Sequence, residues 1–134
     1  MMNNNNQESQ KIIEVYTDAN KFRACIAIEK PDMRTEKEQR YELIVIENKV
    51  DNLFEAEAVR LALNYVPEKS NIRLYCDKEG DLNAIKMKKA SKPRLRIIID
   101  SINSIEKERN LVVEYVSIPR KNNLAGRMLD KIRL

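Results

Sequence analysis

The sequence predicts a single α/β domain, built on a mixed five-stranded sheet with helices on both faces. Three strand-like segments come first, and strands and helices then alternate to the end of the chain. Strands joined by a tight turn pair antiparallel, whereas strands joined through a helix run parallel by a right-handed crossover. With 134 residues, 43% of them hydrophobic, the chain is long enough for one core and too short for two.

The first half of the predicted domain is a group of three strands rich in β-branched and apolar residues: Lys11–Asp18, Lys21–Glu29 and Tyr41–Glu47. Only Ala19 and Asn20 separate the first two, which indicates a hairpin. The charged stretch Lys30–Arg40 has no periodic apolar pattern and is expected to be an exposed turn. Residues 1–10, rich in Asn, are expected to form a disordered tail, so the domain should span 11–134.

The second half alternates helices with strands. From Asn52 the apolar residues recur at helical spacing until Pro67, which predicts a helix of about four turns. Pro93 suits the first turn of a later helix, whose leucine and isoleucines fall on one face. The remaining elements are predicted as two strands, Ile72–Cys76 and Leu111–Ile118, and three helices, Gly80–Lys89, Pro93–Arg109 and Asn123–Ile132.

Charge and cysteine content narrow the class of protein. Lys and Arg number 25 against 21 Asp and Glu, a net charge of +4 that is compatible with a polyanionic partner without requiring one. Cys25 and Cys76 lie inside predicted strands, which favours buried thiols over a disulfide and hence a reducing cytoplasm. No apolar run approaches the roughly 18 residues of a membrane span, and the polar start lacks a signal-peptide core, so we expect no membrane association.

Three carboxylates occupy positions that suit a metal site. Asp18 and Asp77 terminate predicted strands, and Glu55 lies at the start of a predicted helix. Each has an ordinary explanation when taken alone. Asp18 could be a turn residue, Asp77 could cap the next helix, and the charge of Glu55 is favourable in the first turn of a helix. Together, on a parallel sheet covered by that helix, they would supply the oxygen ligands that divalent cations prefer.

The order of these residues resembles the ribonuclease H type 1 family over nearly the whole chain. The family's first strand ends in a Thr-Asp pair, matched by Thr17 and Asp18, and its fourth strand ends in an Asp, matched by Asp77. In the family that Asp is usually followed by Ser and Gln, whereas here Lys78 and Glu79 follow. The family's central helix pattern is matched by Asn52, Glu55, Ala58, Val59, Ala62 and Leu63.

The resemblance implies a ribonuclease H-like fold and a metal-dependent endonuclease that cleaves the RNA strand of RNA–DNA hybrids. Asp18, Glu55 and Asp77 would be catalytic and would hold two Mg²⁺ or Mn²⁺ ions about 3.5–4 Å apart. A protein of replication or reverse transcription is a further expected partner. The expected nucleic-acid contacts are Asn20, Asn52, Lys78, Arg120, Lys121, Asn122 and Asn123.

Departures from the family pattern keep a second function open. Gly126 stands where the family has a fourth metal-site Asp, and the chain has no His. Asp130, one turn later on the same helical face, is a candidate substitute, displaced by about 5.4 Å along the axis. Gly126 favours an inactive module that binds nucleic acid or protein, whereas the three remaining carboxylates favour the enzyme. Another nuclease of the superfamily, acting on DNA, is a third possibility.

Overall fold

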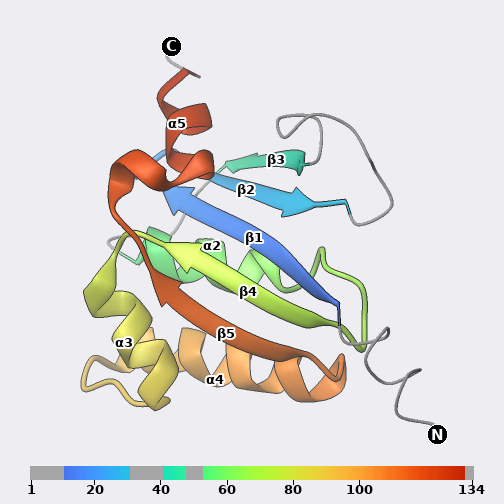
Figure 1. Ribbon diagram of the computed structural model, residues 1–134. Coiled ribbons are helices and arrows are strands. Elements are labelled where there is room, and N and C mark those ends of the chain that lie inside the picture. The colour runs from blue at the N-terminus through green and yellow to red at the C-terminus, as the bar shows by residue number, and fades with distance from the viewer. Residues whose placement is uncertain (1–10, 31–40, 48–52, 132–134) are drawn as a thin grey trace, which may run out of the picture.

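The computed structural model describes residues 11–30, 41–47 and 53–131, and places them in one five-stranded sheet with helices around it (Figure 1). The strand order is β3-β2-β1-β4-β5. The three N-terminal strands pair antiparallel, and β4 and β5 join β1 in parallel, which confirms the predicted mixed sheet. The elements are β1 (Ile12–Ala19), β2 (Arg23–Glu29), β3 (Tyr41–Glu47), α2 (Phe54–Ala62), β4 (Asn71–Cys76), α3 (Glu79–Met87), α4 (Pro93–Glu108), β5 (Val112–Ser117), the 3₁₀ turn η2 (Arg120–Asn122) and α5 (Leu124–Lys131).

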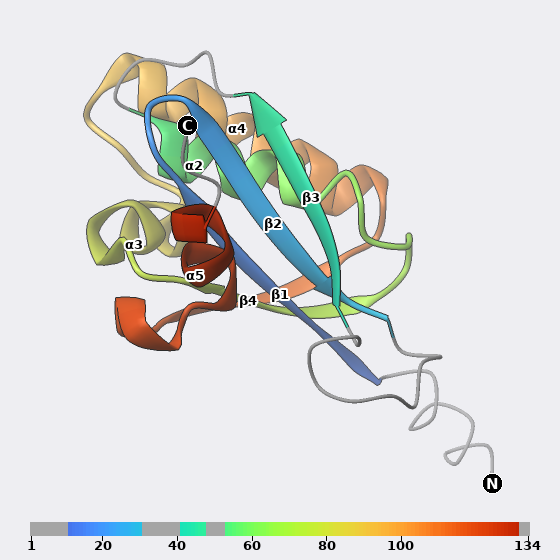
Figure 2. The same cartoon turned by 90° about the horizontal axis from the view of Figure 1, so that it is seen from above.

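Helices cover both faces of the sheet, as predicted. α2 and α4 lie on one face, and α5 lies on the other over the ends of β1 and β2 (Figures 1 and 2). The main core fills the space between the sheet and α2 and α4. The predicted apolar stripe of α4 faces that core, where it is buried together with Val15 and Leu74 of the sheet: its members are Leu95, Ile98, Ile99, Ile102 and Ile105.

Strand β2 is buried on both faces, because α2 and α5 cover it from opposite sides. Its central residues Ala24–Ile28 are all buried, so the strand is apolar without alternation. Cys25 packs against Ala125 and Leu129 of α5. Both Cys25 and Cys76 are buried free thiols, which confirms the prediction that they do not pair.

Helix α2 is shorter than the sequence predicts. It ends at Ala62, not near Pro67. The amide of Leu63 still bonds four residues back, but the two amides after it bond three residues back: Asn64 to the carbonyl of Leu61, and Tyr65 to that of Ala62. This tighter 3₁₀ pattern ends the α-helix. A proline also disfavours helical backbone at the residue before it, here Val66, so the apolar spacing overstated the helix by about one turn.

The small residues of α2 bring its first turn close to the end of β1. Ala58 is fully buried against Ala19 of β1 and Ala24 of β2. Because alanine side chains are short, the helix backbone approaches the sheet closely, which sets the distance that a side chain in the first turn must span to reach β1. This packing positions Glu55.

The other boundaries agree with the predictions to within two residues. β2 begins at Arg23, later than the predicted Lys21, because the side-chain Oδ1 of Asn20 accepts hydrogen bonds from the amides of Phe22 and Arg23 and forms a turn. No described helix is long and apolar enough to cross a membrane. The predicted tail 1–10, most of the loop Lys30–Arg40, and Asn52 lie outside the described residues.

Candidate metal centre

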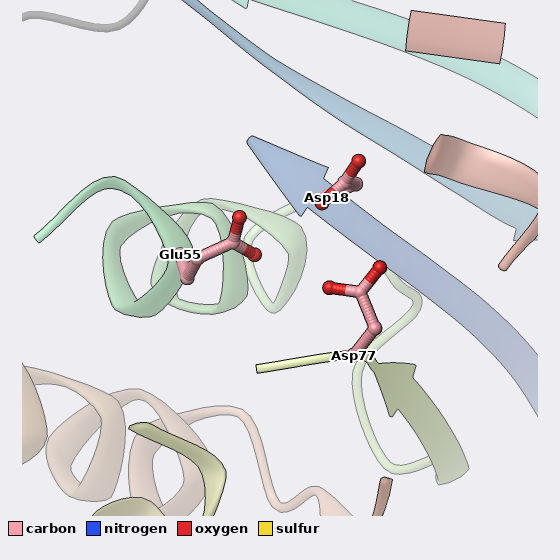
Figure 3. A group of neighbouring side chains, drawn as sticks. All are labelled: Asp18, Glu55 and Asp77. Atoms are coloured by element: carbon pink, nitrogen blue, oxygen red, sulfur yellow. The ribbon is translucent and has the colours of Figure 1, made fainter. Parts of the chain in front are cut away.

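The fold brings the three predicted carboxylates together at one edge of the sheet. β1 and β4 are parallel neighbours with Tyr16 opposite Tyr75, so Asp18 near the end of β1 and Asp77 just after β4 emerge side by side. Glu55 comes from the first turn of α2. Figure 3 shows Glu55 and Asp77 directed toward the end of β1, where Asp18 lies. One carboxylate oxygen from each residue lies within 4.8 Å of the others.

The donor set fits a divalent cation. Asp18 is fully buried, yet its Oδ1 accepts no hydrogen bond from any described residue. The Oε2 of Glu55 accepts one hydrogen bond, from the amide of Ala19 at 3.3 Å. Three crowded carboxylates repel one another unless a cation lies between them, and hard cations such as Mg²⁺ and Mn²⁺ prefer oxygen ligands. Asp18, Glu55 and Asp77 are therefore the residues that would hold such an ion.

Arg120 lies against this cluster. Its Nη1 is 3.2 Å from Oδ2 of Asp18 and 3.6 Å from Oδ2 of Asp77, and its Nη2 donates to Oδ1 of Asp130 at 3.0 Å. Arg120 belongs to η2, the short turn between β5 and α5. The sequence predicted Arg120 as a nucleic-acid contact and Asp130 as a substitute metal ligand. The structure joins the two in an ion pair at the rim of the cluster, and both predicted roles stay predictions.

Burial and mutual repulsion raise the pKa of two of the carboxyls. Loss of solvent and then the charges of Asp18 and Asp77 raise the pKa of Glu55 to about 8. Burial and the charge of Asp77 also raise the pKa of Asp18, while the Arg120 guanidinium acts in the opposite direction. Without a bound cation, the cluster therefore holds its negative charge only at the expense of folding free energy.

We expect Glu55→Gln to stabilise the metal-free protein while weakening its binding of divalent ions. Because the pKa of Glu55 is raised in the folded state, ionisation lowers stability as pH rises from about 4.5 to about 8. The substitution should therefore be nearly neutral at pH 5 and should add about 2 kcal/mol at pH 9. Urea unfolding in EDTA at both pH values measures this. Glu42→Gln, at an exposed site on β3, is the matched control; an equal gain in both variants would contradict the prediction.

The other predicted contact residues fall into two groups. Four of them are exposed: Asn20, Lys78, Lys121 and Asn122. In the sequence, Asn20 follows β1, Lys78 follows Asp77 after β4, and the other two precede α5. Asn123 is fully buried. Its Oδ1 accepts hydrogen bonds from the amides of Ala125 and Gly126, and its Nδ2 donates to the carbonyl of Thr17 at 2.9 Å. The structure thus corrects the role predicted for Asn123: it caps α5 and ties that helix to β1.

Gly126 has a structural reason that its place in the sequence did not reveal. A Cβ atom at this position would lie 3.0 Å from Oδ2 of Asp18. The backbone of α5 therefore rests directly against the Asp18 carboxylate, and a larger residue would have to displace it. The one sequence signal for this close approach is the glycine itself. Inside a helix it costs about 1 kcal/mol relative to alanine, which indicates that a side chain there has no room.

Comparison with known proteins identifies the fold. No protein-family model matches the sequence, and no curated protein matches it. Among solved structures, LC11-RNase H1, isolated from compost, is 23% identical over 90% of this chain and 92% of that one, with a TM-score of 0.59. The same enzyme in complex with an RNA/DNA hybrid gives 22% identity, coverage of 88% and 91%, and a TM-score of 0.55. RNase H1 from Halobacterium salinarum gives 15% identity, coverage of 90% and 97%, and a TM-score of 0.60. The chain has the ribonuclease H fold that the sequence predicted.

Proposed function

We propose that this protein is a divalent-metal-dependent nuclease that cleaves the RNA strand of RNA–DNA hybrids. The observation that carries the proposal is the convergence of Asp18, Glu55 and Asp77 within 4.8 Å at one edge of a ribonuclease H fold. The compost enzyme, which shares this fold, has been solved with an RNA/DNA hybrid bound. An acidic cluster alone is common on protein surfaces, but this one includes the fully buried carboxylate of Asp18.

In the proposed reaction the protein supplies negatively charged carboxylates and holds them in fixed orientations. A bound divalent ion would supply Lewis-acid polarisation of the scissile phosphate and a nucleophilic water at neutral pH. Asp18 is fixed by its place in β1, and Glu55 is oriented by the amide of Ala19. Burial excludes bulk water from Asp18, which strengthens its interaction with any cation beside it. The resemblance implies two ions.

Exposed polar residues around the cluster suit a polyanion. Lys78 directly follows Asp77, while Lys121 and Asn122 lie in η2 beside Arg120. We assign these side chains to backbone phosphates, because duplexes with RNA character are recognised mainly through shape, phosphates and 2′-hydroxyls. Such binding weakens as salt concentration rises. Association with a replication or reverse-transcription protein and a cytoplasmic location stay predictions from the sequence.

Cleavage of labelled substrates tests the function. RNA–DNA hybrid, double-stranded DNA and double-stranded RNA are incubated with Mg²⁺, with Mn²⁺ and with EDTA. We expect the RNA strand of the hybrid to be cut with either metal and left intact in EDTA, with 3′-hydroxyl and 5′-phosphate ends. Preferential cutting of double-stranded DNA would instead identify a DNA-acting nuclease. No cutting of any substrate by folded protein would reject the enzyme.

An inactive binding module is the second candidate, and one observation favours it. The guanidinium of Arg120 already neutralises part of the charge of Asp18 and Asp77 without a metal. A module of this kind would bind hybrid in EDTA as tightly as in Mg²⁺ and would cut nothing. Fluorescence anisotropy of a labelled hybrid in both conditions, read beside the cleavage assay, separates the two functions.

A further inference from the structure

Arg120 holds a fixed positive charge against the buried part of the cluster. The side chain of Asp18 is 1% exposed and that of Asp77 12%, whereas the side chain of Arg120 is 57% exposed. The guanidinium therefore reaches inward with one nitrogen, while more than half of the side chain stays exposed. Its second nitrogen is held by Asp130, itself 55% exposed, on the outer side. Two carboxylates of the cluster thus already share one protein cation.

Helix α5 closes the same side of the cluster without adding a ligand. The backbone at Gly126 lies against Oδ2 of Asp18, the oxygen that also contacts Arg120. Asp130, one turn later on α5, contacts Arg120 and is not part of the group of three carboxylates whose oxygens converge. Within the described residues, this side therefore offers a second metal ion the positive charge of Arg120, and the carboxylate of Asp130 is already paired with that arginine.

Two buried oxygens of the cluster accept no hydrogen bond from described residues: Oδ1 of Asp18 and Oδ2 of Asp77. Oδ2 of Asp77 lies 3.6 Å from Nη1 of Arg120, whereas no ion pair with Arg120 involves Oδ1 of Asp18, and Glu55 approaches from α2. Three carboxylates and one guanidinium carry two net negative charges, which one divalent ion balances; the charge of Asp130, half exposed on the outer side, is screened by solvent. A second divalent ion would leave an excess of positive charge next to Arg120, where the low-dielectric surroundings of Asp18 make such repulsion costly.

We propose that the site binds one divalent ion, held by Asp18, Glu55 and Asp77, and that Arg120 supplies the second positive charge to the substrate phosphate. This inference rests on the proposed nuclease function. Guanidinium is always protonated in proteins and presents its donors in a planar fork that matches phosphate oxygens, so it can take this place at any working pH. One ion and one arginine then replace the pair of ions that the sequence resemblance implies.

Metal binding without nucleic acid tests the stoichiometry. Mn²⁺ is titrated into the full chain and followed by electron paramagnetic resonance and calorimetry. We expect one Mn²⁺ per chain for the wild type. Arg120→Ala should bind its first ion about tenfold more tightly, because a nearby positive charge is gone, and should take up a second ion within the same titration. Lys107→Ala, which removes an exposed cation near the end of α4, should match the wild type. Two ions of similar affinity in the wild type, or an unchanged titration in Arg120→Ala, would overturn the proposal.

In the Arg120 variants, the rate of hybrid cleavage should change in the opposite direction to the metal affinity. If Arg120 supplies charge to the phosphate, Arg120→Ala should lose about 100-fold in single-turnover cleavage although it binds metal more tightly, and Arg120→Lys should recover part of the loss. Faster cleavage by Arg120→Ala would mean that Arg120 merely blocks the site, and would overturn the inference. No metal binding by any variant would reject the nuclease function itself, whereas metal-dependent cleavage with two bound ions would reject only the inference.

Discussion

Replacing Asp18 by Asn is expected to abolish metal-dependent cleavage of an RNA–DNA hybrid, with a fall of about a thousandfold or more in single-turnover rate. Asp18 is the only fully buried member of the three carboxylates, and Oδ1, one of its two oxygens, has no hydrogen-bond donor among the described residues. An amide keeps the shape of the side chain but not the charge that holds the cation. Mn²⁺ affinity should fall together with cleavage. Rates measured with Mg²⁺ and Mn²⁺ over a range of metal concentrations test this.

The fold should survive the Asp18→Asn change. Removing a buried charge that is repelled by Asp77 offsets the loss of the ion pair with Arg120, so the melting temperature in EDTA should change little. Asp100→Asn, on the exposed face of α4, makes the same change of charge away from the cluster and should cleave like the wild type. Residual metal-dependent cleavage by Asp18→Asn within tenfold of wild type would show that Asp18 is not a ligand.

The largest loss of stability is expected for Asn123→Ala. The Asn123 side chain makes three hydrogen bonds inside the protein, one to the carbonyl of Thr17 and two from the first turn of α5. Alanine leaves those buried backbone groups without partners, at a cost of about 2–4 kcal/mol in free energy of unfolding. For a chain of this size the melting temperature should fall by about 10 °C. Differential scanning calorimetry and urea unfolding give both quantities.

The same substitution should also affect the metal site. Thr17 precedes Asp18, so losing the Asn123 bridge should loosen α5 from the strand that carries the buried carboxylate. We expect weaker Mn²⁺ binding by Asn123→Ala even at temperatures where it is fully folded. Asn122→Ala, at the exposed neighbouring position, should change neither stability nor metal binding. If Asn123→Ala unfolds within 0.5 kcal/mol of Asn122→Ala, the capping role is wrong.

Most of the fold could be predicted because local pattern and tertiary packing agree. β-branched runs became strands, and the apolar stripe of α4 became one wall of the core. The prediction of a helix end failed where backbone hydrogen bonds, and not the spacing of apolar side chains, decided where the helix stops. The apolar spacing runs on past Ala62, but 3₁₀ hydrogen bonds and Pro67 end α2 there.

The carboxylates could be predicted as a group, but their neighbours could not. Asp18 and Asp77 end adjacent parallel strands, so topology alone brings them together. Arg120 and Asn123 both looked like surface residues suited to phosphate, because each is polar and lies near the start of the last helix. One contacts the buried carboxylates and the other is a buried cap. Whether such a residue stays at the surface, contacts the carboxylates or caps the helix depends on how α5 packs against β1. No local sequence pattern contains that information.

The sequence by itself determined the order of strands and helices, the mixed sheet and the three candidate carboxylates, because these follow from periodicity, crossover handedness and acidic residues at two strand ends and one helix start. Only the tertiary structure decided what surrounds those ligands. The contact of Gly126 with Asp18, and the ion pairs of Arg120 with Asp18 and Asp77, join residues more than 40 positions apart. Shifts of a few tenths of an ångström between packed elements make or break such contacts, and those positions are set only when α5 docks on the sheet.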